Sequence, residues 1–194
     1  MAHKFNPRHA ESLDDPRRST WMPDDIVVGL LKLTGAETVV DYGAGTGTFA
    51  LPVADALPRG RVVAVDLSRE LLDRLGDKVA SHLTDRVEIV HTTTNEIPLP
   101  DGSADAVLTV NVLHEIADEP EALAEIRRVL KPGGRFVVVD WAHVERPVGP
   151  PTDHVLTLDQ ARAVVGSIGL HIAEAREPGG PLPYHFTITA EAPR

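Results

Sequence analysis

Cysteine is absent from this chain of 194 residues. The protein can therefore form no disulfide and offer no thiolate nucleophile or cysteine metal site. No apolar run approaches the roughly 20 residues that a membrane-spanning helix needs, so we expect no membrane association. The first residues are polar and lack the apolar core of a signal peptide, which predicts a cytoplasmic protein.

Positive charge is also scarce, because 29 acidic residues face 19 basic ones and the formal net charge is −10. This balance disfavours a general binder of phosphate backbones, so we expect no nucleic-acid partner. The hydrophobic fraction of 42% and the charged fraction of 25% are ordinary for a soluble globular protein. The length suffices for one domain with a sizeable core, and the chain contains no internal repeat.

The most informative stretch is Thr38 to Ala50, which reads T-V-V-D-Y-G-A-G-T-G-T-F-A. Its apolar run ends in Asp41, and a second apolar run, 61–65, ends in Asp66. Three glycines lie between them at alternating positions: Gly43, Gly45 and Gly47. Glycine lets backbone approach a ligand closely, and a helix start offers unpaired N–H groups. An acid at the end of the second strand can accept both hydroxyls of a ribose, so the unit predicts a nucleotide site.

The glycine spacing narrows the ligand. A dinucleotide fingerprint, G-x-G-x-x-G, would need its third glycine at Thr48, whereas here the pattern is G-x-G-x-G. Asp66 lies 21 residues beyond Gly45, close to the spacing of about 20 expected for a ribose-binding acid. A nicotinamide-dependent oxidoreductase is therefore an alternative that the spacing disfavours, as does the lack of a second catalytic domain. A tight turn without any ligand is the structural alternative.

Four motifs in order resemble those of the class I S-adenosylmethionine-dependent methyltransferases of the small type 11 kind, over most of 39–168. They are the glycine segment, A-V-D-L-S (64–68), I-P-L-P-D-G-S-A-D-A-V (97–107) and R-R-V-L-K-P-G-G-R-F (127–136). A looser similarity joins H-K-F (3–5) and G-P-P (149–151) to an uncharacterised branch of that family.

The alternation of strand and helix patterns predicts an α/β fold with a mostly parallel sheet and helices on both faces. The resemblance implies a seven-stranded, Rossmann-like methyltransferase fold with an antiparallel C-terminal edge pair. We expect residues 1–22 to form an irregular arm, a possible cover of the active site, and residues 23–194 a single domain. Expected strands are 38–42, 61–66, 87–91, 104–110, 136–141, 170–176 and 184–190; expected helices are 24–33, 48–57, 68–81, 119–130 and 158–168.

The resemblance implies S-adenosylmethionine as cofactor and S-adenosylhomocysteine as product, bound beyond the carboxyl ends of the strands. The glycines would admit the methionine part, with Asp41 orienting their loop and Tyr42 and Ala44 beside it. Asp66 would hold the ribose and Leu67 would pack on the adenine. The other expected contacts are Thr93, Thr94 and Asn111, where many relatives carry G-D-A in place of Thr92–Thr94. The acid that often binds the adenine amino group is thus replaced by Thr93.

The segment after the fourth expected strand carries the candidate chemistry. His114 is a candidate base or orienting residue, because its ordinary pKa near 6.5 suits proton transfer, and Glu115 is a weaker candidate. A histidine satisfied by backbone is the structural alternative. Trp141 and His143 are expected to form an acceptor wall. Four other histidines lack metal-like spacing and are expected on the surface or in loops: His3, His9, His154 and His185.

The predicted reaction is methyl transfer to an unidentified, small-molecule acceptor, without a metal. The missing cysteines argue against thiolate-dependent arsenite methylation, which otherwise resembles this fold. A module that binds S-adenosylmethionine without catalysis is the alternative function, since the cofactor half has readable motifs and the acceptor half does not.

Overall fold

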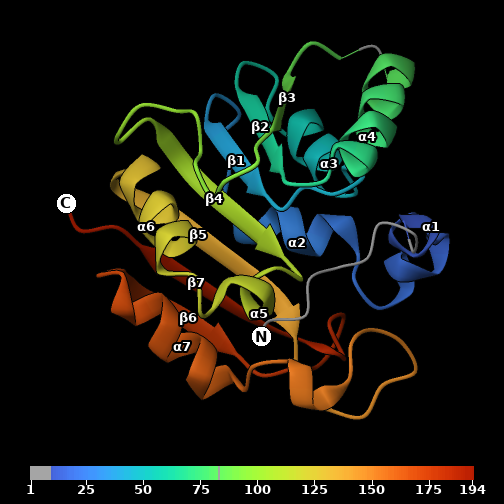
Figure 1. Cartoon of the computed structure of the whole chain (residues 1–194), viewed down its shortest axis with the longest axis vertical. Coiled ribbons are helices and arrows are strands. Elements are labelled where there is room, and N and C mark those ends of the chain that lie inside the picture. Colours follow the sequence, from blue (N-terminus) through green and yellow to red (C-terminus); the bar gives the residue numbers. More distant parts are fainter. Residues whose placement is uncertain (1–9, 83) are drawn as a thin grey trace.

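The computed structural model describes residues 10–82 and 84–194 and contains one seven-stranded sheet of order β3-β2-β1-β4-β5-β7-β6 (Figure 1). The strands are β1 Thr38–Tyr42, β2 Arg61–Asp66, β3 Val87–His91, β4 Ala104–Val110, β5 Leu130–Trp141, β6 His171–Arg176 and β7 His185–Glu191. The first five strands pair in parallel, and β7 pairs antiparallel with both β5 and β6. The predicted fold class, including the antiparallel edge pair, is confirmed.

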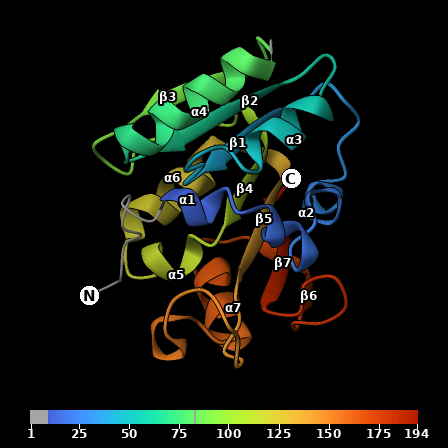
Figure 2. The same cartoon turned by 90° about the vertical axis from the view of Figure 1, so that its right-hand side faces the viewer.

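Helices cover both faces of the sheet (Figures 1 and 2). One apolar cluster packs α2 Asp24–Leu30, α3 Ala50–Asp55 and α4 Arg69–His82 against β1 and β2. The other packs α5 Leu113–Ile116, α6 Pro120–Val129 and α7 Leu158–Ser167 against β4, β5 and β7. Strands that are covered on both faces consist of continuous apolar runs. For this reason β2 and β4 could be predicted from the sequence.

Strand order reverses between β1 and β4, which pair in parallel with Val39 opposite Ala106 and Asp41 opposite Leu108. A connection from β1 leads to one side of this point and a connection from β4 to the other. The carboxyl ends of the two strands therefore leave an opening between their loops, where ligands bind in folds of this kind.

Most element boundaries lie within three residues of the predicted ones, and three regions differ. The expected irregular arm contains a short helix, α1 Ala10–Leu13, and the 3-10 helix η2 Pro16–Thr20, capped by the Asp15 carboxylate. α5 was not predicted, because its four residues are too few for a helical apolar period.

β5 begins at Leu130, six residues before its predicted start. The expected helix ended at 130 and the expected strand began at 136, so residues 131–135 were expected to connect them. In the structure Gly133 N–H donates to Ala192 and Ala192 N–H donates to Gly134, at 3.0 and 2.9 Å, so the segment is tied to the chain beyond β7. α6 ends at Val129 and β5 begins at the next residue, Leu130, so no loop separates the two elements.

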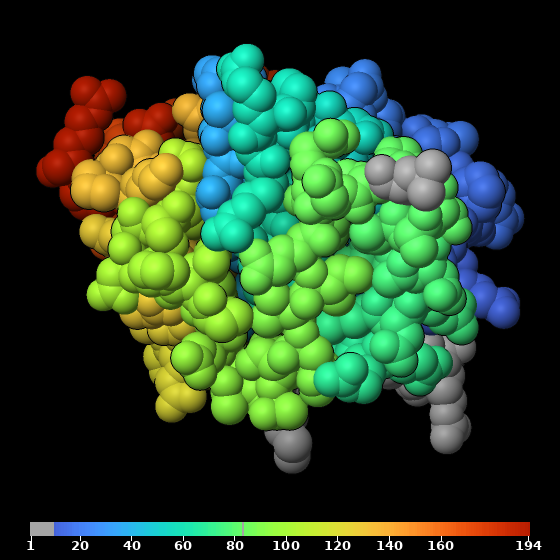
Figure 3. All heavy atoms as spheres, turned by 90° about the horizontal axis from the view of Figure 1, so that it is seen from above, coloured from blue at the N-terminus to red at the C-terminus, as the bar shows by residue number. Residues whose placement is uncertain are grey.

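The surface over the β3 edge is formed mainly by α4 and by the segment that follows β3 (green in Figure 3).

Among the described residues, no helix is both long enough and apolar enough to cross a membrane. The 3-10 helix η3 Thr152–His154 interrupts the loop between β5 and α7.

Candidate cofactor and acceptor site

The loop after β1 is shaped by its glycines. Gly43, Gly45 and Gly47 have φ values of 79°, 56° and 79°, in the left-handed region that favours glycine. A Cβ atom at Gly43 would collide with Val112, and one at Gly47 with Leu75. The loop is held under β2, since the N–H groups of Gly43 and Ala44 donate to the Val65 carbonyl at 2.8 and 3.1 Å. The backbone here is fixed in a form that side chains would prevent.

Asp66 connects the end of β2 to this loop. One carboxylate oxygen accepts from Gly45 N–H and the other from Ser68 N–H, both at 2.8 Å. Burial raises the pKa of Asp66 above its ordinary value, against the opposing effect of these N–H donors. Each oxygen uses one lone pair in this way and retains another, so the carboxylate can still accept two hydroxyl groups.

Asp41 lies at the end of β1 and is 3% exposed. Burial, with the neighbouring charge of Asp66, raises the pKa of Asp41 to about 7. A bound cation would offset both effects, so this carboxyl group is suited to lie near positive charge. Its role in orienting the glycine loop stays a prediction.

The other expected cofactor residues are divided between surface and core. Leu67 is 42% exposed at the end of β2, and Thr93 and Thr94 are exposed beyond the end of β3. Tyr42 and Ala44 are buried in the two apolar clusters, and the Tyr42 hydroxyl lies 3.4 Å from the Asn95 carbonyl. The side chain of Tyr42 therefore supports the site from within the core.

Asn111 directly follows β4 and has a φ of 60°; it is one of two non-glycine residues with positive φ in the described chain. Its N–H donates to the Val139 carbonyl at 2.8 Å, while its side-chain oxygen is buried without a partner. A strained residue that is held by its surroundings often marks a functional position. This one lies opposite the glycine loop, at the switch point.

His114 contacts Asp140 through both its side chain and its backbone. Its Nδ1 lies 2.7 Å from one Asp140 oxygen, and its backbone N–H donates to the other at 2.9 Å. The two side chains are 5% and 1% exposed. Burial lowers the pKa of His114, but the charge and hydrogen bond of Asp140 outweigh it, with help from Glu115, and the net shift is upward.

The geometry leaves one nitrogen of His114 for chemistry. Because Asp140 engages Nδ1, the reactive nitrogen is Nε2, and Glu115 Oε1 lies 4.0 Å from it. Asp140 was not singled out in the sequence, where it appeared only as a member of the fifth strand. Its signal was its place at the carboxyl end of a buried strand, where a charged residue needs a partner.

Residues 10–22 pack directly on the glycine loop (Figure 2). Leu13 lies 3.4 Å from where a Gly45 Cβ would be, and its carbonyl accepts from Thr48 Oγ1 at 3.1 Å. Asp14 accepts from Thr46 Oγ1 at 2.6 Å and from Lys78 Nζ at 2.5 Å.

Among the histidines expected on the surface or in loops, His185 differs from the prediction and His154 agrees with it. Trp141 is 7% exposed at the end of β5, while His143 is exposed beyond it. His185 was expected on the surface and is instead 1% exposed, because the start of β7 packs against Trp141. His154 is exposed in η3, and His3 and His9 lie outside the described residues.

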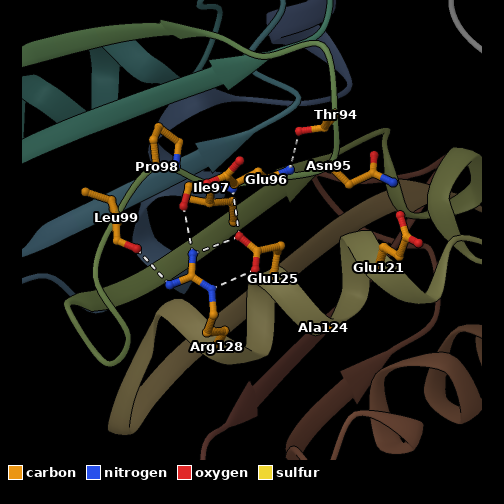
Figure 4. Close-up of a pocket in the computed structure, with 10 residues that line it drawn as sticks. All are labelled: Thr94, Asn95, Glu96, Ile97, Pro98, Leu99, Glu121, Ala124, Glu125 and Arg128. Carbon is orange, nitrogen blue, oxygen red and sulfur yellow. Dashed lines mark hydrogen bonds and ion pairs between the residues drawn. The ribbon is translucent and has the colours of Figure 1, made fainter.

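A separate hollow lies between the segment after β3 and α6 (Figure 4). Its floor is occupied by Arg128, which pairs with Glu125 at 2.6 Å and donates to the Ile97 and Leu99 carbonyls at 2.8 Å. Asp101 pairs with the same guanidinium at 2.7 Å. The hydrogen-bonding groups of Arg128 are therefore used within the fold, and this hollow has a structural explanation.

Known proteins resemble this chain in sequence. The model of a family described as "Methyltransferase domain" matches residues 40–138. A 27-O-demethylrifamycin SV methyltransferase of Amycolatopsis mediterranei is 30% identical over 158 residues, which are 80% of this chain and 58% of that protein. A ubiquinone/menaquinone biosynthesis C-methyltransferase of Syntrophotalea carbinolica is 34% identical over 61% of this chain and 49% of its own length. The chain thus spans about half the length of these two relatives.

Among solved structures, a SAM-dependent methyltransferase from Aquifex aeolicus superposes with a TM-score of 0.89 at 29% identity, covering 97% of this chain and 99% of that one. With the family match and the seven-stranded fold, this shows the class of protein. The chain belongs to the class I S-adenosylmethionine-dependent methyltransferases of the type 11 family.

Proposed function

We propose that this protein is an enzyme that transfers a methyl group from S-adenosylmethionine to a small-molecule acceptor. The observation that carries the proposal is that two groups of functional residues lie at the ends of adjacent strands. A glycine loop joined to the Asp66 carboxylate lies on the β1 side, and the His114–Asp140 pair lies on the β4 and β5 side.

The residues fit the cofactor. Glycine at 43 and 47 lets the loop backbone lie close against Val112 and Leu75, and Asp66 has lone pairs for two ribose hydroxyls. Leu67 and the exposed backbone at Thr93 and Thr94 would face the adenine, without an acid for its amino group. Asp41 would lie near positive charge. When bound, S-adenosylmethionine supplies an electrophilic methyl group on a positively charged sulfur.

The protein's remaining task is to position the acceptor and to accept its proton. Good alignment of two reactants can lower a barrier by roughly 7–11 kcal/mol. We assign proton acceptance to His114 Nε2, because Asp140 holds the opposite nitrogen and stabilises the charge that forms on the ring. Asp140 is therefore a positioning residue. Asn111 would orient the groups that meet at the switch point.

The arm, residues 1–22, would cover the site. Its described part closes over Gly45 through Leu13 and is fastened by Asp14 to Thr46 and Lys78. A closed site excludes water, which strengthens the electrostatic interactions inside it. The net charge of −10 also disfavours nucleic-acid partners.

Calorimetric titration with S-adenosylmethionine, S-adenosylhomocysteine and NAD, each alone, tests the cofactor. We expect the first two to bind and NAD not to bind; the reverse result would make the chain a nicotinamide-binding protein. Formation of S-adenosylhomocysteine over a panel of phenols, amines and carboxylic acids then tests catalysis. A protein that binds the cofactor tightly and forms no product with any of these acceptors would be a binding module.

A further inference from the structure

Both tryptophans of the chain meet at the end of β5. The ring centroids of Trp21 and Trp141 lie 5.5 Å apart. The His185 ring stacks on Trp21 at 5.5 Å and 4°, and lies 4.2 Å from Trp141 at 35°. We call these three rings, with Arg18 and Arg146, the Trp–Arg cluster. It brings together the arm, β5, the loop after β5 and the start of β7.

In the described residues neither arginine of the cluster forms a direct ion pair, although Asp14, Asp15 and Asp24 act on Arg18 at longer range and Asp140 acts on Arg146. The Arg18 guanidinium lies 5.8 Å from the Trp21 ring and donates to the Leu13 carbonyl at 3.1 Å. The Arg146 guanidinium lies 5.2 Å from the Trp141 ring and donates only to backbone carbonyls, among them Ala142 at 2.8 Å. Burial lowers the pKa of both groups. Two partly buried cations without a direct carboxylate contact are unfavourable, because a buried charge is costly unless it is paired.

His185 adds one N–H donor and one acceptor nitrogen, and no charge. Burial, helped by the positive charges of Arg18 and Arg146, lowers its pKa to about 3, so the ring is neutral near pH 7. Both of its nitrogens are buried without a partner. In the described residues six buried side-chain polar atoms lack a partner, and four belong to the Trp–Arg cluster: Arg18 Nε, Arg146 Nε and both His185 nitrogens. Buried polar atoms without a hydrogen-bond partner are costly and rare in folded proteins.

An anion would satisfy this arrangement. A carboxylate accepts hydrogen bonds from guanidinium and imidazole N–H groups together, and it would form the direct ion pair that the arginines do not have. A flat ring attached to it would stack on the indole faces. The cluster adjoins the proposed base through Asp140. The backbone N–H of Trp141 donates to the Asp140 carboxylate at 2.7 Å, and the same carboxylate contacts His114.

We propose that the Trp–Arg cluster binds the acidic group of the methyl acceptor, and that the acceptor is a small aromatic carboxylic acid. This inference rests on the proposed function, because it places the acceptor between the cluster and His114. His185 is 1% exposed, so the ligand would enter when Trp21 and its arm move. Both tryptophans would then change their surroundings, which makes intrinsic fluorescence a direct measure of binding.

The test uses the full chain saturated with S-adenosylhomocysteine and titrated with benzoate or with its neutral analogue benzamide. We expect benzoate to change tryptophan fluorescence saturably and benzamide to bind at least about tenfold more weakly, a ratio that corresponds to about 1.4 kcal/mol. Arg18→Gln should weaken benzoate about tenfold. Arg17→Gln is the matched control, since Arg17 is the next residue along the arm and its side chain is 86% exposed.

His185→Phe separates binding from folding. Phenylalanine fills the same space without unpaired nitrogens, so the melting temperature should stay the same or rise, while benzoate affinity falls about tenfold. A drop in melting temperature with unchanged benzoate affinity would show that His185 has only a structural role and would overturn the proposal.

The cofactor also carries a carboxylate, at its amino-acid end, and a further comparison distinguishes this source. If Arg18→Gln weakened S-adenosylhomocysteine as strongly as benzoate, but left 5′-methylthioadenosine unaffected, the cluster would serve the cofactor and the proposal would be wrong. Equal binding of benzoate and benzamide would also contradict it. Failure of S-adenosylhomocysteine to bind the unmodified protein would instead refute the proposed function itself.

Discussion

The two sides of the switch point are built in different ways. On the β1 and β2 side, the candidate cofactor site is mostly backbone, with three glycines at positive φ and one carboxylate, Asp66, as its main polar side chain. On the β4 and β5 side, the candidate acceptor site is made of side chains from distant segments, including Arg18, His114 and His185.

This difference explains why one side could be read from the sequence and the other could not. A backbone cradle needs glycine at set positions, so its requirements are local and leave a pattern. A site made of side chains needs only that distant residues meet, and many residue types can meet that need. We expect the cofactor side to fail through its backbone or its one acid, and the acceptor side through single side chains.

The largest effect on the cofactor side is expected from Asp66→Ala. Loss of two hydroxyl-to-carboxylate hydrogen bonds, each worth about 1.5–3 kcal/mol, should weaken S-adenosylmethionine at least about a hundredfold in calorimetric titration. Asp73→Ala, at an exposed position of α4, is the control. Asp66→Asn keeps an acceptor for one loop N–H and guards against simple unfolding. Unchanged affinity in both Asp66 variants would remove the ribose assignment.

His114→Ala tests the acceptor side. We expect turnover to fall about a hundredfold, within the range typical of a lost general base, while S-adenosylmethionine affinity stays within about twofold. His171→Ala, on the exposed start of β6, should change neither quantity. Equal losses of affinity and turnover in His114→Ala would mean that the two sides are not separable here.

Asp140→Asn should lower turnover about tenfold and change its pH dependence. The Asp140 charge helps to raise the pKa of His114, and a base acts in its neutral form. The rising limb of the pH–rate profile should therefore move to lower pH in the variant. A raised histidine pKa also stabilises the fold below about pH 6.5 and less as pH rises through the folded value, so the variant should lose stability mainly at low pH. An unmoved profile would contradict the positioning role.

The smallest effect is expected from Asp41→Asn, measured as melting temperature against pH. Because the pKa of Asp41 rises to about 7 on folding, the unfolded chain loses its proton first as pH increases from about 4 to 7. The native protein therefore becomes less stable over that window, and the neutral amide does not. We expect the variant to match the parent near pH 4 and to melt several degrees higher at pH 8. A constant difference across pH would exclude a raised pKa.

Particular residues show how far sequence reasoning reached. The strands β1, β2, β3 and β4 were predicted with their observed boundaries. Of these, β1, β2 and β4 are buried parallel strands, which form nearly continuous apolar runs. The capping box of α7, formed by Thr157 and Gln160, confirms the predicted start of that helix. α5 escaped prediction because it is too short to show a period, and the arm because its helices are fixed by contacts with distant residues.

His185 and Asp140 show the limit most clearly. Nothing around His185 in the sequence indicates burial, yet Trp21 from the arm and Trp141 from β5 enclose it. Asp140 is a candidate because its carboxylate lies 2.7 Å from Nδ1 of His114, a residue 26 positions earlier in the sequence. Both depend on strand register and on how the arm packs, which no short segment encodes.

The amino-acid order by itself determined the parallel strands, the glycine turn and the acid at position 66, because each rests on the conformational preferences of neighbouring residues. Only the tertiary structure decided which arginines remain without a direct carboxylate contact, which histidine gains one, and which rings meet at the end of β5. Charge and contact between distant side chains depend on separation in space, and folding alone sets that separation.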